Sequence, residues 1–307
     1  MGLRINNNIE SMVAHRNLLK NDRALSKSLE RLASGQRVNR AADDPAALVI
    51  SEHMRSKISG MEQAIRNNEV AISLVQTAEG SMNEISSLLV SIRQRAISAA
   101  NVGASDDAMT QANQSEIENA LSSIDRIVSS TQFGHYKLLD GTNAEKTTTN
   151  EDGSISIQEG LRFHVGPDAG HTASTSIRDM NTSQLGRATV AEGELPNSSN
   201  FMSLADIDVG TEQGSQDALG IIDQAITEVA SVRGELGAFQ ANTLESNLTS
   251  LQVAAENMTS AESTLRDTDM AQELATFTRN QIMSQSATAQ LAQANALPQN
   301  VLRLLNS

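Results

Sequence analysis

The sequence predicts a mainly α-helical protein: a long antiparallel helical hairpin, or coiled-coil bundle, of N- and C-terminal arms, with a small β-hairpin region in the middle. Apolar residues recur at heptad spacing towards both ends of the 307-residue chain, as in helices that pack along a narrow seam. Between about residues 141 and 210 this periodicity stops, and Gly, Thr, Ser and Asn accumulate. Aromatic residues make up only 2% of the chain, which favours thin helical packing over a thick globular core.

Residues 1–44 predict a first helix followed by a connector. The apolar row of this helix consists of Leu18, Leu25, Leu29 and Leu32. Gly35 follows the row where a helix needs a left-handed C-terminal residue, a conformation that glycine adopts without a Cβ clash. We therefore expect the helix to end at about residue 34.

The stretch SGQRVNRAADDP separates this helix from the next one. Asp43 or Asp44 can accept hydrogen bonds from the free N–H groups of a new helix, and Pro45 suits its first position because proline has no N–H to leave unpaired. The candidate residues of this polar, basic connector are Gly35, Arg37, Asn39, Asp43, Asp44 and Pro45.

Residues 45–140 predict two more helices, of which the first runs to about Asn101. Its heptad positions are Ile58, Met61, Ile65, Asn68, Ile72, Val75, Glu79, Met82, Ser86, Leu89, Arg93 and Ala96. The polar members Asn68, Glu79 and Arg93 either fix the register of the seam or are simply exposed positions.

A shorter helix and then a β region are expected next. The sequence Ser105-Asp106-Asp107 starts the helix, whose buried positions are Ile117, Leu121, Ile124 and Val128. We assign residues 141–214 to a β-hairpin and loop region, because ISIQEGLRFHVGPDAG has the composition of two short strands around turns.

The C-terminal arm matches the N-terminal arm in character. Residues 215–267 predict a long helix with heptad positions Leu244, Leu248, Leu251, Ala255, Met258, Glu262 and Leu265. Residues 268–307 predict a final helix, in which Pro298 should start or kink the last turn because proline lacks the N–H that the helix bond requires. The acidic cluster Asp267, Asp269 and Glu273 is better explained by a helix start than by a cation site.

The terminal segments, residues 1–44 and 268–307, are expected to pack side by side. A two-helix pair covers only one side of each apolar stripe, so the remaining surface requires other copies of the chain. A head-to-tail contact that does not close generates an open helical polymer. The candidate residues of this assembly interface are Leu18, Leu25, Leu29, Leu32, Leu291, Leu297, Val301 and Leu304.

Composition and motifs argue against several other functions. A net charge of −14 disfavours binding to nucleic acids or anionic membranes. No stretch approaches the roughly 20 apolar residues of a membrane span, and the N-terminal residues lack the apolar core of a signal peptide. Cysteine is absent, the five histidines do not have metal-ligand spacing, and phosphate-binding and nucleophile motifs are missing. We therefore expect no catalytic residue, metal site or cofactor.

Both arms resemble bacterial flagellin. The N-terminal arm of that family is similar to LERLASGQRVNRAADDPAALVISEHMRSKISGMEQAIRNNEVAISLVQTAEGSMNEI, and its C-terminal arm is similar to AAENMTSAESTLRDTDMAQELATFTRNQIMSQSATAQLAQANALPQNVLRLL. The segments RFHVGPDAG and SIRDMNTSQLG also resemble the β-hairpin region of the family's outer core. The resemblance covers residues 1 to 140 and 215 to 307 in the right order.

The resemblance implies a structural subunit that is exported unfolded and polymerises into the extracellular flagellar filament used for swimming. It implies that residues 1–44 and 268–307 form an inner layer, and that residues 45–140 and 215–267 form the helices of an outer layer. SGQRVNRAADDP is then the spoke between the two layers. The short loop at residues 190–210 leaves little room for the outer domains of larger flagellins.

The partners implied by the resemblance are further copies of the chain, an export chaperone, the filament cap, the hook–filament junction proteins and other flagellins. The alternative function is that of a hook–filament junction protein, which is present in far fewer copies. An enzyme carried on the filament by an inserted middle domain is a third reading. The middle is short for that role and has no catalytic constellation.

The resemblance also bears on immune recognition. Arg93 and Glu116 match an arginine and a glutamate that the vertebrate flagellin receptor contacts. Gln94 and Arg95 depart from the family pattern, because many recognised flagellins have Glu and Leu there. A cation in place of an apolar contact adds a desolvation cost, so a weakened receptor surface is expected.

Overall fold

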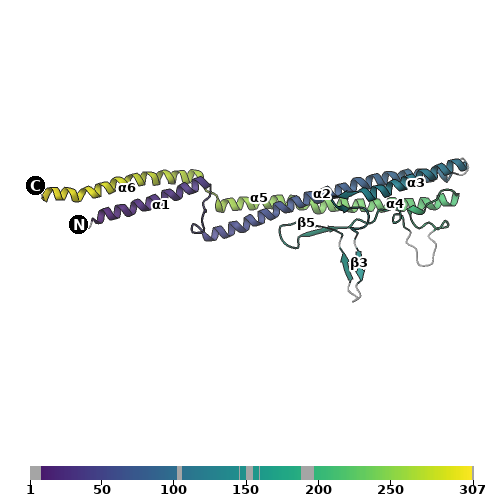
Figure 1. Ribbon diagram of the computed structural model, residues 1–307, viewed down its shortest axis with the longest axis horizontal. Helices are drawn as coiled ribbons and strands as arrows, with labels where there is room; N and C mark the ends of the chain where they lie inside the picture. The colour runs from purple at the N-terminus through teal and green to yellow at the C-terminus, as the bar shows by residue number, and fades with distance from the viewer. Residues whose placement is uncertain are drawn as a thin grey trace. The chain divides into compact units, whose positions relative to one another are not determined.

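The computed structural model describes residues 8–101, 106–144, 146–149, 155–158, 160–187 and 197–305. Figure 1 shows long helices at both ends of the chain and short strands between them. The chain divides into two compact units: residues 1–58 with 255–307 form unit 1, and residues 59–254 form unit 2. The predicted fold class, paired helical arms with a small β region, is confirmed.

Unit 1 is built on two antiparallel helices from opposite ends of the chain. It contains α1 (Ile9–Ser34), the start of α2 (Pro45–Ala99), the end of α5 (Ser246–Arg266) and α6 (Met270–Leu305). Ser11, near the start of α1, donates a hydrogen bond to Asn295, near the end of α6, over 2.6 Å. At the other end of the pair, Arg31 lies 3.5 Å from Glu273. The two arms therefore pack against each other as predicted.

The helix ends around the connector follow the predicted chemistry. Gly35 has a φ of 71° and donates its N–H to the carbonyl of Arg31 over 2.8 Å, which closes α1. At the start of α2, the carboxylate of Asp44 accepts the N–H of Ala47 over 3.0 Å. Asp44 is therefore the N-cap, and Pro45 is the first residue of the helix.

Of the two alternatives expected for Pro298, a start of the last turn is wrong, because α6 runs as one helix through Pro298 to Leu305. A proline at this position cannot donate to the carbonyl of Ala294. The side-chain amide of Asn8 donates to that carbonyl instead, over 2.8 Å. The same side chain accepts the N–H of Ser11 and caps α1, so one residue satisfies backbone groups of both helices.

Unit 2 contains helices with a β region packed against them. Its helical elements are the rest of α2, α3 (Asp107–Ser130), the 3₁₀ turn η1 (Leu204–Asp206), α4 (Glu212–Ala238), the π-helix η2 (Phe239–Glu245) and the start of α5. Asp106 caps α3 as predicted, and all four apolar positions predicted for α3 are buried. The β region contributes the buried side chains of Leu138, Leu139, Ile177, Met180 and Leu185, each at most 2% exposed.

Strands in the described residues form three two-stranded antiparallel sheets. The pairs are β1 (Gln132–Phe133) with β2 (Tyr136–Lys137), β3 (Lys146–Thr149) with β4 (Ile155–Gln158), and β5 (Leu161–His164) with β6 (Thr172–Thr175). The two strands predicted from ISIQEGLRFHVGPDAG are present as β4 and β5, but each pairs with a different partner. The first hairpin, β1–β2, was not predicted, since its strands are only two residues long.

The seam of α2 corrects half of the predicted heptad. The positions Met61, Asn68, Val75, Met82, Leu89 and Ala96 are buried as expected. The alternate positions are Ala64, Ala71, Ala78, Ile85 and Ile92, each one residue before the position that the sequence predicted. The isoleucines Ile65 and Ile72, and the polar residues at 79, 86 and 93, are only partly buried. Small alanines occupy the seam because they let the helices approach closely, while the larger isoleucines pack along its edge.

The C-terminal arm differs from the prediction in one feature. Leu244 and Leu251 are buried as predicted. The expected continuous helix is instead α4, η2 and α5 in direct succession, with a π-helical segment that simple heptad counting does not indicate. Within the described part of the chain, no helix combines the length and apolar character needed to cross a bilayer.

The Ala78→Leu substitution tests the corrected seam. Because Ala78 is 0% exposed, a larger side chain should overpack the interface and lower the free energy of unfolding by about 1–3 kcal/mol. The matched control is Ala230→Leu on the exposed face of α4, which should change little. Thermal unfolding followed by far-UV circular dichroism compares the two. Equal stability of both variants would contradict the corrected seam and support the original prediction, in which Glu79 lies in the seam.

Candidate functional site

The interface between α1 and α6 combines leucine and phenylalanine side chains with small and polar ones. Half-buried or buried residues recur at heptad spacing on both helices. On α1 they are Ser11, Ala14, Leu18, Asn21, Leu25, Ser28 and Leu32, and on α6 they are Glu273, Phe277, Asn280, Ser284, Ala287, Leu291 and Ala294. Ser284 donates to Asp22 over 2.8 Å, and Asn280 donates to Ser28 over 3.5 Å. The two helices are therefore held together by apolar packing of the leucines and Phe277 and by hydrogen bonds between the polar side chains.

Other large apolar side chains of the same helices are exposed. On α1 they are Ile9, Met12, Val13, Leu19 and Leu29, and on α6 they are Met270, Leu274, Ile282 and Met283. Met12 is 69% exposed and Ile282 is 58% exposed, and large apolar side chains gathered on the outside of one helix pair are typical of an interaction surface. We call these nine residues the outward apolar set.

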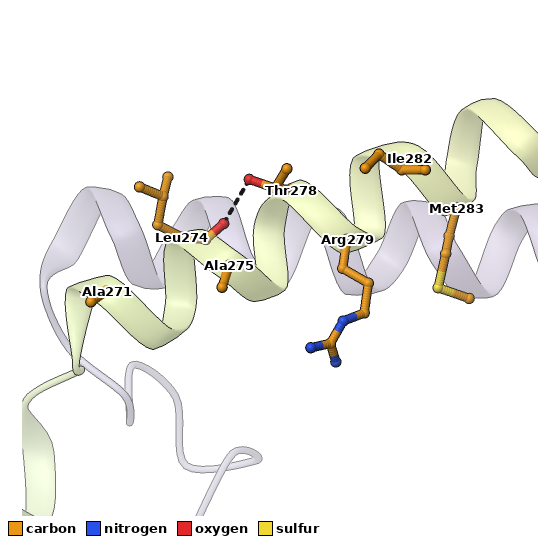
Figure 2. A pocket seen from close by; sticks show the side chains of 7 residues that line it. All are labelled: Ala271, Leu274, Ala275, Thr278, Arg279, Ile282 and Met283. Atoms are coloured by element: carbon orange, nitrogen blue, oxygen red, sulfur yellow. Dashed lines mark hydrogen bonds between the residues drawn. The ribbon is translucent and has the colours of Figure 1, made fainter.

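Part of this set borders a shallow hollow of about 600 Å³ along α6, lined by Ala271, Leu274, Ala275, Thr278, Arg279, Ile282 and Met283. Figure 2 shows Leu274, Thr278 and Ile282 along one edge of the helix, and Ala275, Arg279 and Met283 along the other. The hydroxyl of Thr278 donates to the carbonyl of Leu274 over 2.9 Å, so its hydrogen-bonding capacity is used within the helix. The hollow therefore offers apolar surface with one cation.

The predicted assembly residues of α1 divide between two faces. Leu18, Leu25 and Leu32 lie at the heptad position of Ser11, are half-buried, and so pack towards α6 within the same chain. Leu29 is 51% exposed and belongs to the outward apolar set.

On α6, Leu291 is half-buried on the stripe that faces α1. The side chains of Leu297, Val301 and Leu304 lie outside the described residues. Sequence reasoning missed Met12, Leu19 and Ile282. The signal that could have found them is a second apolar row, visible in the seven-residue spacing of Met12 and Leu19.

The spoke connector, residues 35–44, is tied to the break between α5 and α6. Gln36 forms an isolated antiparallel bridge with Asp267. The N–H of Arg37 donates to the carbonyl of Arg266 over 2.6 Å, and the N–H of Thr268 donates to the carbonyl of Gly35 over 2.9 Å. Both arms therefore break at the same level, and the two breaks are hydrogen-bonded to each other.

The rest of the spoke connector folds back onto α1. Asn39 donates to the carbonyl of Glu30 over 3.3 Å, and the guanidinium of Arg40 lies 2.9 Å from the carboxylate of the same residue. Asp43 forms an ion pair of 2.6 Å with Lys27. These contacts give the predicted connector residues a common role in fixing where α2 starts.

Two carboxylates at this level have lowered pKa values. The hydrogen bond from Lys27 holds the pKa of Asp43 below its ordinary value, and the hydrogen bond from Arg266 does the same for the pKa of Glu52. A lowered folded-state pKa means that each group stabilises the fold above the ordinary carboxyl pKa, and that this contribution is lost as the pH falls through the folded pKa. The ion pairs of Asp43 and Glu52 are therefore intact at neutral pH.

The residues compared with an immune-receptor surface lie in unit 2 and form ion pairs. Arg93 of α2 lies 2.6 Å from Asp223 of α4, and this carboxylate raises the pKa of the guanidinium. Arg95 pairs with Glu116 of α3. Arg93 and Glu116 thus form ion pairs with different residues. The partner of Glu116 is Arg95, the residue that departs from the family pattern.

The acidic cluster at the start of α6 acts in capping. Asp269 accepts the N–H groups of Ala271 and Gln272 over 2.9 and 3.1 Å. In the part of the chain that the structure describes, no group of three or more His, Asp or Glu side chains is arranged to hold a metal ion.

Comparison with known proteins identifies relatives along nearly the whole chain. Residues 5–144 match the bacterial flagellin N-terminal helical region, and residues 219–305 match the bacterial flagellin C-terminal helical region. A flagellin of Bacillus subtilis strain 168 is 41% identical over 309 residues, covering 99% of this chain and 100% of the relative. A flagellar filament 30.7 kDa core protein of Treponema maltophilum is 37% identical, covering 98% of this chain and 99% of the relative.

Among solved structures, the fold is similar to that of a putative flagellar hook-associated protein from Vibrio parahaemolyticus. The TM-score is 0.55 at 16% sequence identity, covering 73% of this chain and 100% of the other. At this identity the likeness concerns the fold alone.

The Glu52→Gln substitution tests the anchoring of the spoke connector. It removes the charge that Arg266 contacts over 2.8 Å, and the carbonyl of Arg266 in turn holds Arg37. We expect trypsin to cleave after Arg37 and Arg40 about two- to fivefold faster at neutral pH, as befits loss of one exposed ion pair. Glu62→Gln, at an exposed position of α2, is the control. Identical cleavage rates in the two variants would show that this ion pair does not hold the connector.

Proposed function

The chain belongs to the bacterial flagellin family, and we propose that it builds the flagellar filament by covering its outward apolar set with neighbouring copies of itself. It is a structural subunit of the filament, as its flagellin and filament core relatives are by name. The observation that carries the proposal is the division of the α1–α6 pair into a seam filled by side chains of the same chain and an exterior with exposed large apolar side chains.

The physical argument starts from what each face can bind. The seam has already used its side chains in contacts within the chain, such as Ser11 with Asn295. The exterior offers large apolar side chains among exposed charged ones such as Arg16 and Lys20, and the surface that complements its apolar part best is another apolar helix face. A second copy carries that face on the same pair of helices. A repeated contact of this kind, related by a rotation that does not close, extends into a helical filament.

The segments of the chain receive roles on the same basis. We assign residues 1–44 and 268–307 to an inner layer of subunit contacts, residues 45–140 and 215–267 to the helices of an outer layer, and residues 141–214 to a β-hairpin and loop region. The spoke connector sets the two layers apart. Its support is the double break at Gly35 and Asp267, with the bridge between Gln36 and Asp267.

The relatives extend the proposal to location and partners. Flagellar filaments are extracellular, and we infer that this chain reaches the filament by the flagellar type III export route. An export chaperone, the filament cap and the hook–filament junction proteins are its proposed partners, together with other flagellins. The alternative role as a junction protein has no specific observation in its favour, because the hook-associated likeness is one of fold at 16% identity. The relatives are structural proteins, and no catalytic role is proposed.

Replacing two members of the outward apolar set tests the assembly surface. The double variant Leu274→Ser with Ile282→Ser should keep the α1–α6 seam but lose roughly 1–3 kcal/mol of burial per side chain in each subunit. We therefore expect seeded polymerisation, measured by sedimentation and electron microscopy, to fail at concentrations where the parent assembles.

The matched control changes two exposed polar residues of the same helix, Gln272→Ser with Gln281→Ser. Its cost in helix propensity is at least as large, because Gln is a better helix former than Ile, and it should polymerise like the parent. Filaments of normal length from the apolar double variant would remove the outward apolar set as the assembly surface.

Deletion of residues 291–307 tests the role of the C-terminal arm separately. Because these residues belong to unit 1, the melting of unit 2 should remain almost unchanged while polymerisation is lost. Circular dichroism and seeded assembly measure the two properties. A truncated chain that still forms stable filaments would contradict the assignment of this arm to subunit contacts.

A further inference from the structure

The buried row of the C-terminal arm shifts by one residue at η2. In α4 the row contains Val229, Val232 and Leu236, with the alternating spacing of a heptad. A continuous heptad would place the next equivalent of Leu236 at residue 243, but the buried residue is Leu244. From there the seven-residue spacing resumes, and Leu251 is buried.

The positions that an unshifted heptad would bury after η2 are on the outside. Ser246 and Ser250 are exposed, and Val253 is 54% exposed. The facing helix has no such shift, because the seam of α2 keeps strict heptad spacing from Met61 to Ala99. The C-terminal arm therefore contains one residue more than its partner over the same stretch.

The π-helical geometry of η2 is what absorbs this extra residue. Hydrogen bonds in a π-helix span five residues instead of four, so one wide turn takes up an added residue without rotating the following helix. An α-helical segment of the same length would turn the following residues by about 100° relative to the seam. Leu244 and Leu251 would then leave the core.

The β5–β6 hairpin docks at this place. The rings of Phe163 in β5 and Phe239 at the start of η2 have centroids 6.3 Å apart. Just after η2, the side-chain amide of Asn247 donates to the carbonyl of Val165 over 2.6 Å. The rotational phase of the helix on both sides of η2 therefore determines whether the hairpin can contact Phe239 and Asn247.

The facing helix also contacts the end of strand β5 and the residue after it. Asn68 of α2 donates to the carbonyl of Val165 over 3.3 Å, and Asn67 donates to the carbonyl of His164 over 3.1 Å. Amides from both helices thus converge on one strand end. Only one orientation of α5 brings Asn247 to the carbonyl that Asn68 already contacts.

We propose that η2 is a phase corrector: a one-residue insertion, held as a π-helix, that returns Leu244 and Leu251 to the core and presents Asn247 to the β5–β6 hairpin. The essential property is the phase of the helix after η2. The wide turn itself is dispensable, provided that the extra residue is removed with it.

Deleting single exposed alanines tests the proposal on the full-length chain. Removal of Ala241 from η2 leaves Leu236 and Leu244 seven residues apart, so an ordinary α-helix keeps both in the seam. We expect its melting temperature, measured by circular dichroism, to stay within about 3 °C of the parent. Amide exchange of the β5–β6 strands should also be unchanged.

The matched control removes Ala230, an exposed alanine of α4. If η2 becomes α-helical, it can restore the phase of the residues that follow it. Val232 and Leu236 lie between the deletion and η2, so they remain rotated out of the core. We expect the melting temperature to fall by about 10 °C or more. The proposal is overturned if removal of Ala241 destabilises the chain as much as removal of Ala230, or leaves it unfolded.

A third variant, Asn247→Ala, examines the hairpin contact directly. It should raise amide exchange in β5 and β6 about five- to tenfold, the effect of one lost hydrogen bond, while the helices melt as in the parent. Unchanged exchange in this variant would show that Asn247 does not hold the hairpin. Increased exchange on removal of Ala241 would show that the wide turn, rather than the phase, is required.

Discussion

Packing of long helices along narrow heptad seams is the constraint on which the rest of the structure depends. In unit 2 the seam of α2 alternates large residues such as Met82 and Leu89 with small ones such as Ala71 and Ala78. A narrow seam buries only the side chains that face it, so the remaining large ones lie along its edges or on the outside. Each unit therefore requires another layer.

The two units meet this requirement differently. In unit 2 the additional layer comes from the same chain, because α3 and the β region cover the helices and contribute a fully buried core. In unit 1 the described residues of the chain leave Met12, Leu274 and Ile282 exposed. If copies of the chain supply the missing layer, as we propose, the stability of unit 1 depends on protein concentration in a way that the stability of unit 2 does not.

Sequence reasoning recovered the helices, the connector and the paired arms, because glycine, aspartate and proline mark helix ends by local chemistry. It misplaced half of the α2 seam because Ile65 and Ile72 are more hydrophobic than the neighbouring alanines, and the heptad that they set was continued to Ser86 and Arg93. The buried residues there are Ile85 and Ile92, in phase with the alanines. The outward apolar set was missed because the leucine row of α1 predicts one apolar face, although this helix carries two apolar rows. The phase shift at η2 could not be predicted, because it is defined by comparison with the heptad of α2, a helix distant in the sequence.

The polar groups in the seam of unit 1 have a further physical consequence. A wholly apolar seam would resemble the outward apolar set, and α1 could then pair through either face, or with α6 of another copy in several registers. The partly buried hydrogen bonds of Asn8 with the carbonyl of Ala294 and of Asn280 with Ser28 are satisfied in one register only. A shift along the helices would leave these groups without partners, at a cost that an apolar seam does not impose. Polar contacts thus select the pairing of α1 with α6 within one chain. The exposed apolar surface is left for less specific contacts with other copies.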